Sequence, residues 1–290
     1  MRVDASELDS ENHHPKRITM FNYYRMSSVF RRAAFAFLTA IGLTYSRQTT
    51  PEKIHELFRK LWPQNIGVDL HKCGEYLIPT DIGVIDAVFS PGVGPNSEFE
   101  LFFASKNIPC YMADASVDAP SVSNSNFHFV KKYIGATTQG EFINLEDWIH
   151  QNYPEGQNAV LQMDIEGAEY ESILSVSSET LKRFKLIVME IHYLNFLASQ
   201  EGMALGSAFF HHLLKDFTVA HFHVNNFLRP VKFKDVMFPA DIEITLARND
   251  LVKNPQPVEV LPHPLDIKNN PNKRDHQFHQ YFRDGVVARY

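Results

Sequence analysis

The sequence predicts an α/β fold in which helices flank a mostly parallel, seven-stranded Rossmann-like sheet. From Val84 onward, short apolar runs alternate with amphipathic stretches, which is the pattern of parallel strands joined by crossover helices. A chain of 290 residues, 44% of them apolar and 21% charged, has the size and composition of one large globular domain with extensions. We therefore expect a main domain at residues 66–250, a helical cap at 1–65 and a tail or lid at 251–290.

Each predicted strand is a short apolar run that ends at a polar or turn-forming residue. The seven strands are expected at residues 84–89, 108–113, 127–133, 159–163, 186–191, 219–224 and 241–247. Helices are expected at residues 97–105, 145–151, 168–176 and 204–214. Trp148 is expected to pack its helix on the sheet, and Phe209 and Phe210 are expected in the core.

The N-terminal extension shows a polar tail followed by two stretches of helical spacing. A first helix is predicted near residues 20–45 and a second at residues 49–61, where Thr-Thr-Pro-Glu supplies a hydroxyl cap, an early proline and an acid. The apolar run Ala33–Leu43 is well short of the roughly 20 residues that span a bilayer. It is interpreted as a buried helix, with a peripheral membrane contact as the alternative.

Charge and cysteine content exclude some classes of function. A formal net charge of −6 gives no general attraction to a nucleic-acid backbone, so a nucleic-acid partner is not expected. The two cysteines, Cys73 and Cys110, are far apart in the sequence and provide neither a disulfide framework nor a four-cysteine zinc site. We expect a cytoplasmic protein and leave open whether it forms a homodimer.

A glycine-containing turn, Ser-Pro-Gly-Val-Gly-Pro-Asn at residues 90–96, follows the first predicted core strand. Gly92 and Gly94 allow the backbone to approach a ligand closely, and Asp114 at the end of the next strand can accept the hydroxyl hydrogens of a ribose. A dinucleotide site would need a glycine or alanine where Ser97 stands, and Glu98 would repel a pyrophosphate. S-adenosylmethionine, which carries a positive sulfur, tolerates such acids.

A second group of candidate residues lies at the carboxyl ends of three later strands, where open α/β sheets place their chemistry. Asp164 opens an acidic stretch that runs from a strand directly into a helix. Alternation places Glu190 and His192 on one side of the chain, and His221, His223 and Asn225 on one face. We expect His192 or His223 to be a general base assisted by Asp164, with Glu190 as an orienting acid. A divalent metal held by some of Asp164, Glu190, His192 and His223, or a purely structural role, is the alternative.

The chain resembles the FkbM family of S-adenosylmethionine-dependent methyltransferases. The resemblance is carried by Met-Asp-Ile-Glu-Gly-Ala-Glu-Tyr at residues 163–170, Ser-Pro-Gly-Val at 90–93, Ala-Asp-Ala-Ser at 113–116, Val-Met-Glu-Ile-His at 188–192 and His-Phe-His-Val-Asn-Asn at 221–226. These motifs occur in the family order, and the resemblance covers roughly residues 66–250. Relatives often have Gly-Asp-Gly-Gly-Tyr where this chain has Lys-Cys-Gly-Glu-Tyr at residues 72–76, so a substrate contact from that segment is in doubt.

The resemblance implies a class I methyltransferase fold with an antiparallel last strand and S-adenosylmethionine as the cofactor. It also implies O-methylation of a small molecule or glycan, of the sugar, glycolipid or polyketide type. The cofactor-binding residues expected from the turn and the family motifs are Pro91, Gly92, Gly94, Asn96, Asp114, Ser116 and Asp164. A nicotinamide-dependent oxidoreductase and a non-catalytic binding module are the rival hypotheses.

Overall fold

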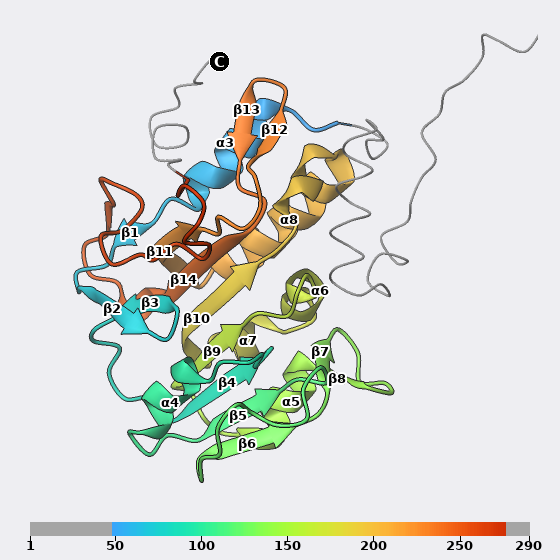
Figure 1. The fold of residues 1–290 in the computed structure, drawn as a ribbon, viewed down its shortest axis with the longest axis vertical. Coiled ribbons are helices and arrows are strands. Elements are labelled where there is room, and N and C mark those ends of the chain that lie inside the picture. Colours follow the sequence, from blue (N-terminus) through green and yellow to red (C-terminus); the bar gives the residue numbers. More distant parts are fainter. Residues whose placement is uncertain (1–47, 277–290) are drawn as a thin grey trace, which may run out of the picture.

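The computed structural model describes residues 48–276, and the helix expected near 20–45 lies outside this range. A seven-stranded sheet runs through the molecule in the order β11-β14-β10-β9-β4-β5-β6 (Figure 1). Its strands are β4 (Ala87–Pro91), β5 (Cys110–Ala113), β6 (Phe127–Val130), β9 (Ala159–Met163), β10 (Phe184–Ile191), β11 (Phe217–Val224) and β14 (Ile242–Arg248).

β14, the last of the seven strands along the chain, runs antiparallel to the others. β14 pairs antiparallel with both β10 and β11, whereas β10, β9, β4, β5 and β6 pair in parallel. This order and the reversed strand confirm the class I methyltransferase Rossmann-like fold. The chain order reverses at β4, which lies between β9 and β5, and a ligand crevice is expected at the carboxyl ends of these strands.

Alternating side chains give the sheet two apolar faces. On β4, Phe89 packs in the larger core, and Trp148 confirms its predicted role by contacting it edge to face, with ring centroids 5.1 Å apart. Val88 points to the opposite face, where it packs in a second core. The larger core lies under α3 (Pro51–Lys60), α5 (Leu145–Asn152), α6 (Glu169–Leu174) and α8 (Gln200–Leu214). The second face lies under α4 (Glu98–Ala104), β2 (Leu70–Cys73) and β3 (Tyr76–Pro79).

Helix α3 agrees with the helix expected at residues 49–61. Pro51 occupies its first turn and Thr50 is the N-cap residue, although the Thr50 hydroxyl caps no backbone amide. The buried side of α3 carries Phe58, whose ring lies 6.0 Å from that of Phe238. Phe238 belongs to a hairpin of β12 (Val231–Phe233) and β13 (Val236–Phe238) that the sequence pattern did not predict.

Six of the seven predicted strands have different limits in the structure, and the strands predicted at residues 84–89 and 127–133 differ most. The first begins at Ala87 instead of Val84, because pairing with β9 begins at Ala87, and Val84 is 69% exposed. The strand predicted at residues 127–133 ends at Val130, and Tyr133 instead begins β7 (Tyr133–Gly135), which pairs with β8 (Phe142–Asn144). The limits of a strand depend on the length of its neighbours, which the hydrophobic pattern does not contain.

The segment after β14 is fixed to the domain over its described part. β15 (Gln256–Pro257) pairs with β1 (Gln64–Asn65), and the Asn270 backbone amide donates to the side chain of Asn226. This part of the expected tail or lid therefore covers the carboxyl end of β11. Over residues 48–276, no helix has the length and apolar character needed to cross a membrane.

Candidate functional site

Four polar residues form a row across neighbouring strands at the carboxyl ends of β9 and β10. Glu190 on β10 is directly opposite Glu243 on β14, which is opposite His223 on β11. Asp164 follows Met163, the partner of Met189, and so reaches the level of Glu190. The predicted convergence of Asp164, Glu190 and His223 is therefore present in the backbone, with Glu243 as an additional member.

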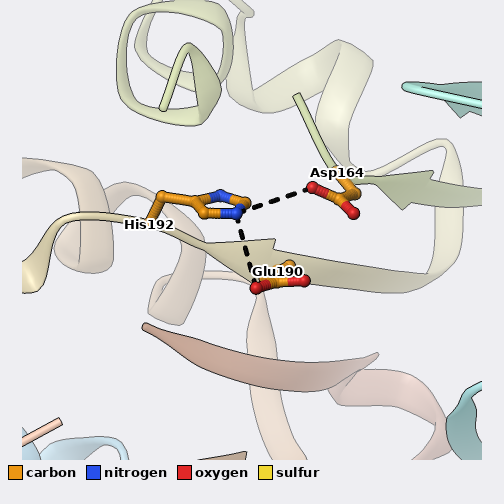
Figure 2. A group of neighbouring side chains, drawn as sticks. All are labelled: Asp164, Glu190 and His192. Atoms are coloured by element: carbon orange, nitrogen blue, oxygen red, sulfur yellow. Dashed lines mark ion pairs between the residues drawn. The ribbon is translucent and has the colours of Figure 1, made fainter. Parts of the chain in front are cut away.

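His192 is buried at the end of this row and is held from behind by Glu169. Its Nδ1 lies 3.0 Å from Oε1 of Glu169, which also accepts hydrogen bonds from the backbone amides of Ile165 and Gly167. Because the Glu169 carboxylate acts as an acceptor toward both amides, it also accepts from the imidazole. Nδ1 of His192 therefore carries a hydrogen and donates it to Glu169. The other ring nitrogen, Nε2, faces Glu190 and Asp164 at 3.4 and 3.7 Å (Figure 2).

The loop between β9 and α6 has the backbone conformation that this arrangement requires. Glu166 and Gly167 both have positive φ, at 56° and 104°. A Cβ at Gly167 would lie 2.5 Å from the ring of Tyr193, so only glycine fits there. On the other side, the Tyr170 hydroxyl donates to the His192 carbonyl at 2.8 Å, and this fixes the end of β10 relative to α6.

Burial and crowded charge shift the pKa values of Asp164, Glu190 and His192. Burial raises the pKa of Asp164 to about 7, with His192 opposing the shift and the nearby carboxylates adding to it. Burial and the negative charges of Asp164 and Glu243 likewise raise the pKa of Glu190 well above its usual value. Burial acts to lower the pKa of His192, but Glu169, Glu190 and Asp164 together raise it. Such perturbed groups gather at functional sites.

The glycine turn after β4 packs directly against Asp164. Gly92 has a φ of 84°, and a Cβ there would lie 1.7 Å from the Asp164 carbonyl oxygen. The Asp164 amide in turn donates to the Pro91 carbonyl at 3.2 Å. Gly94 has a φ of 54°, and a Cβ there would meet no atom within 4 Å. The turn therefore has one closely packed glycine and one glycine beside open space.

Asp114 follows β5 and lies next to the Gly94 side of the turn. Its Oδ2 accepts the Gly94 amide at 3.2 Å, while its Oδ1 accepts both the amide and the hydroxyl of Ser116, at 2.7 and 2.6 Å. Since a carboxylate oxygen accepts two hydrogen bonds, Oδ2 retains capacity for a ribose hydroxyl. Ser116 thus orients Asp114, and Asn96 shapes the turn by accepting the Glu98 amide at 3.0 Å.

His223 belongs to the row but not to the group around His192. Its Nδ1 lies 3.0 Å from Glu243, and its Nε2 lies 3.6 Å from Asp275 in the C-terminal segment. In residues 48–276, the cluster of side chains placed to share one metal ion contains Asp164, Glu190 and His192. Of the four candidate metal ligands considered from the sequence, three therefore remain. The side chain of Asn225 donates to Glu190 at 2.6 Å and holds this carboxylate in place.

Three site residues were not singled out as functional from the sequence. Glu169 belongs to the acidic stretch that Asp164 opens, and it holds His192 through Nδ1. Alternation along the last strand could have identified Glu243, because it places this acid on the same face of the strand as the polar residue Thr245. Tyr76, in the segment that departs from the family motif, is half-buried, and its hydroxyl accepts from Gln162 at 3.4 Å. Burial and the charges of Asp164, Glu190 and Glu243 raise the pKa of Tyr76.

No family model and no curated protein matches the chain. Among solved structures, it is similar to a variant of a 16S rRNA (adenine-N1)-methyltransferase from Catenulisporales acidiphilia, with 11% identity and a TM-score of 0.30 over 64% of this chain and 98% of that one. It is also similar to 1,6-didemethyltoxoflavin-N1-methyltransferase from Burkholderia thailandensis, bound to S-adenosylhomocysteine, with 10% identity and a TM-score of 0.28 over 57% of this chain and 71% of that one. TM-scores this low carry no argument about the fold, which the strand order of the sheet shows by itself.

Proposed function

We propose that this protein is an S-adenosylmethionine-dependent methyltransferase of the FkbM type that methylates a hydroxyl group. The observation that carries the proposal is the contact between Gly92 and the Asp164 carbonyl. It joins a turn suited to an adenosine cofactor to the row of acids and histidines at which a second substrate would react. Both parts lie at the carboxyl edge of the sheet, beside the strand where the chain order reverses.

The cofactor would bind with its ribose on Asp114 and its methionine end along the turn at Gly94. The free capacity of Asp114 Oδ2 and the open space beside Gly94 support this orientation. The bound cofactor would supply a methyl group activated by a positive sulfur, and the carboxyl oxygens of Asp164 and Glu190 favour such a cation over a pyrophosphate. This preference disfavours the nicotinamide-dependent oxidoreductase.

The acceptor hydroxyl would lie at Asp164, whose side chain is 34% exposed while that of His192 is 2% exposed. In the absence of any bound ion, His192 would receive the hydroxyl proton at Nε2, with Glu169 holding the ring and Asp164 assisting. His223 would act as a positioning residue through Glu243. The family resemblance extends the proposal to a sugar, glycolipid or polyketide acceptor.

Calorimetric titration tests the cofactor half of the proposal. S-adenosylhomocysteine should bind to the purified chain and NADH should not. Asp114→Asn should weaken binding by about 10- to 100-fold, because hydrogen bonds to a charged group contribute about 1.5–3 kcal/mol. Asp118→Asn is the matched control, because Asp118 is 95% exposed and pairs with Lys131. Binding of NADH alone, or equal affinities for the two variants, would refute the assignment.

Transfer of a labelled methyl group tests the acceptor half. Pools of glycans, glycolipids and polyketides would be incubated with the enzyme and methyl-labelled S-adenosylmethionine. Because a methyl ether resists alkali and a methyl ester does not, O-methylation of a hydroxyl should give an alkali-stable label. An alkali-labile product would show that the acceptor is a carboxylate, and the proposal of a hydroxyl acceptor would then be wrong.

A further inference from the structure

We propose that Asp164, Glu190 and His192 together bind one divalent cation. Each offers one ligand atom, and the three atoms lie within 4.8 Å of one another. Figure 2 shows the two carboxylates turned toward Nε2 of His192 from the end of β9 and from β10. The binding site follows from these three residues alone and does not depend on the proposed methyltransferase activity.

The distances between the ligand atoms suit a shared ion better than direct hydrogen bonds. Nε2 of His192 lies 3.4 Å from Glu190 Oε1 and 3.7 Å from Asp164 Oδ1, both longer than the usual 2.7–3.2 Å of a nitrogen-to-oxygen hydrogen bond. Two ligand atoms that are each about 2.1 Å from an ion lie about 3.0 Å apart at a right angle and about 3.4 Å apart at a tetrahedral angle. Small adjustments of the side chains would therefore complete the coordination.

The hydrogen bonding of His192 is the independent observation that points to a ligand. Its side chain is 2% exposed, and Glu169 occupies Nδ1, so the lone pair of Nε2 is directed at two carboxylates. Oδ1 of Asp164 is itself buried and has no hydrogen-bond partner among the described residues. Three acceptor atoms that face one another repel unless a proton or a metal cation lies between them.

Glu169 supplies the support that metal-binding histidines ordinarily have. A histidine ligand usually donates its other ring hydrogen to a carboxylate, which fixes the ring and increases its basicity. Glu169 accepts that hydrogen at 3.0 Å and is held in place by the amides of Ile165 and Gly167. One imidazole and two carboxylates suit Mn²⁺ and similar small divalent ions.

The role of the cation deepens the proposed function and, unlike the binding itself, rests on it. An ion at this position would bind the oxygen of the acceptor hydroxyl and lower its pKa. His192 would then be a ligand, and the base role given to it above would apply only to the metal-free protein.

Titration of the cofactor-free chain with Mn²⁺, followed by electron paramagnetic resonance, tests the binding. One ion per chain is expected, and the electron spin echo of bound Mn²⁺ should show coupling to an imidazole nitrogen in the unmodified protein. Asp164→Asn and Glu190→Gln should each weaken binding at least about tenfold. His212→Gln is the control and should leave binding unchanged, because His212 lies on α8 and its Nε2 is 2.8 Å from the Val176 carbonyl, outside the cluster.

Absence of stoichiometric Mn²⁺ binding, or binding without nitrogen coupling, would overturn the inference. So would equal affinities in the two ligand variants and the control, each confirmed as folded by circular dichroism. S-adenosylhomocysteine binding is measured separately. If S-adenosylhomocysteine binds and Mn²⁺ does not, only the cation site is refuted. If Mn²⁺ binds and S-adenosylhomocysteine does not, only the proposed function is refuted.

Discussion

The two glycines of the turn after β4 should respond very differently to the same substitution. Both have positive φ, so alanine at either position costs about 1–2 kcal/mol of backbone strain. At Gly92 the added Cβ would also lie 1.7 Å from the Asp164 carbonyl oxygen, which is main chain and cannot rotate away. At Gly94 it would meet nothing within 4 Å. Gly94→Ala is therefore the matched control for Gly92→Ala.

The clash sets the size of the expected difference. Forcing an extra carbon into a packed site typically costs about 1–3 kcal/mol, because the surrounding backbone must move. Gly92→Ala should therefore lower the free energy of unfolding by about 2–5 kcal/mol, and Gly94→Ala by about 1–2 kcal/mol. Because the shifted atoms belong to Asp164, the first substitution should also weaken Mn²⁺ binding, which Gly94→Ala should leave intact.

Urea denaturation followed by circular dichroism measures the difference directly. The two variants should share the m-value of the unmodified chain, so that their midpoints report stability alone. If Gly94→Ala destabilised the protein as much as Gly92→Ala, the contact between the turn and β9 would not be the constraint inferred here.

Two further substitutions test the interior of the domain. Burial raises the pKa of Glu100 above its ordinary value of 4.5, and the hydrogen bond with Ser90 offsets this only in part. Because the folded state holds this proton more tightly than the unfolded state, the stability contribution falls as pH rises from about 4.5 through the folded-state pKa. Glu100→Gln should therefore be more stable than the unmodified chain at pH 8, with the gap closing on acidification in thermal unfolding scans. A gap that widens toward acid would contradict this sign. Phe209→Ala, at a fully buried ring on α8, should cost about 3–5 kcal/mol in urea denaturation, and a loss below 1 kcal/mol would show that the core relaxes around it.

Much of the domain follows from local patterns in the sequence. The apolar run at residues 159–163 became β9 with the same limits, and the helix start at Pro51 was readable from the proline and the acid beside it. Gly92, Gly94 and Asp114 were found because turns and strand ends have local signatures. The β12–β13 hairpin was missed, since strands of three residues carry too few alternations to be recognised.

The sequence by itself determined the order of the elements, the glycine turn and the placement of Asp164, Glu190 and His192 at strand ends, because each depends on neighbours along the chain. Only the tertiary structure decided which of these side chains meet. Strand pairing aligned Glu190 with Glu243 and His223, and the C-terminal segment then brought Asp275 to within 3.6 Å of His223. The fold of one loop gave His192 its partner Glu169, 23 residues away in sequence. Such contacts depend on register and on the direction of side chains in space, and neither is written in the spacing of residues along one strand.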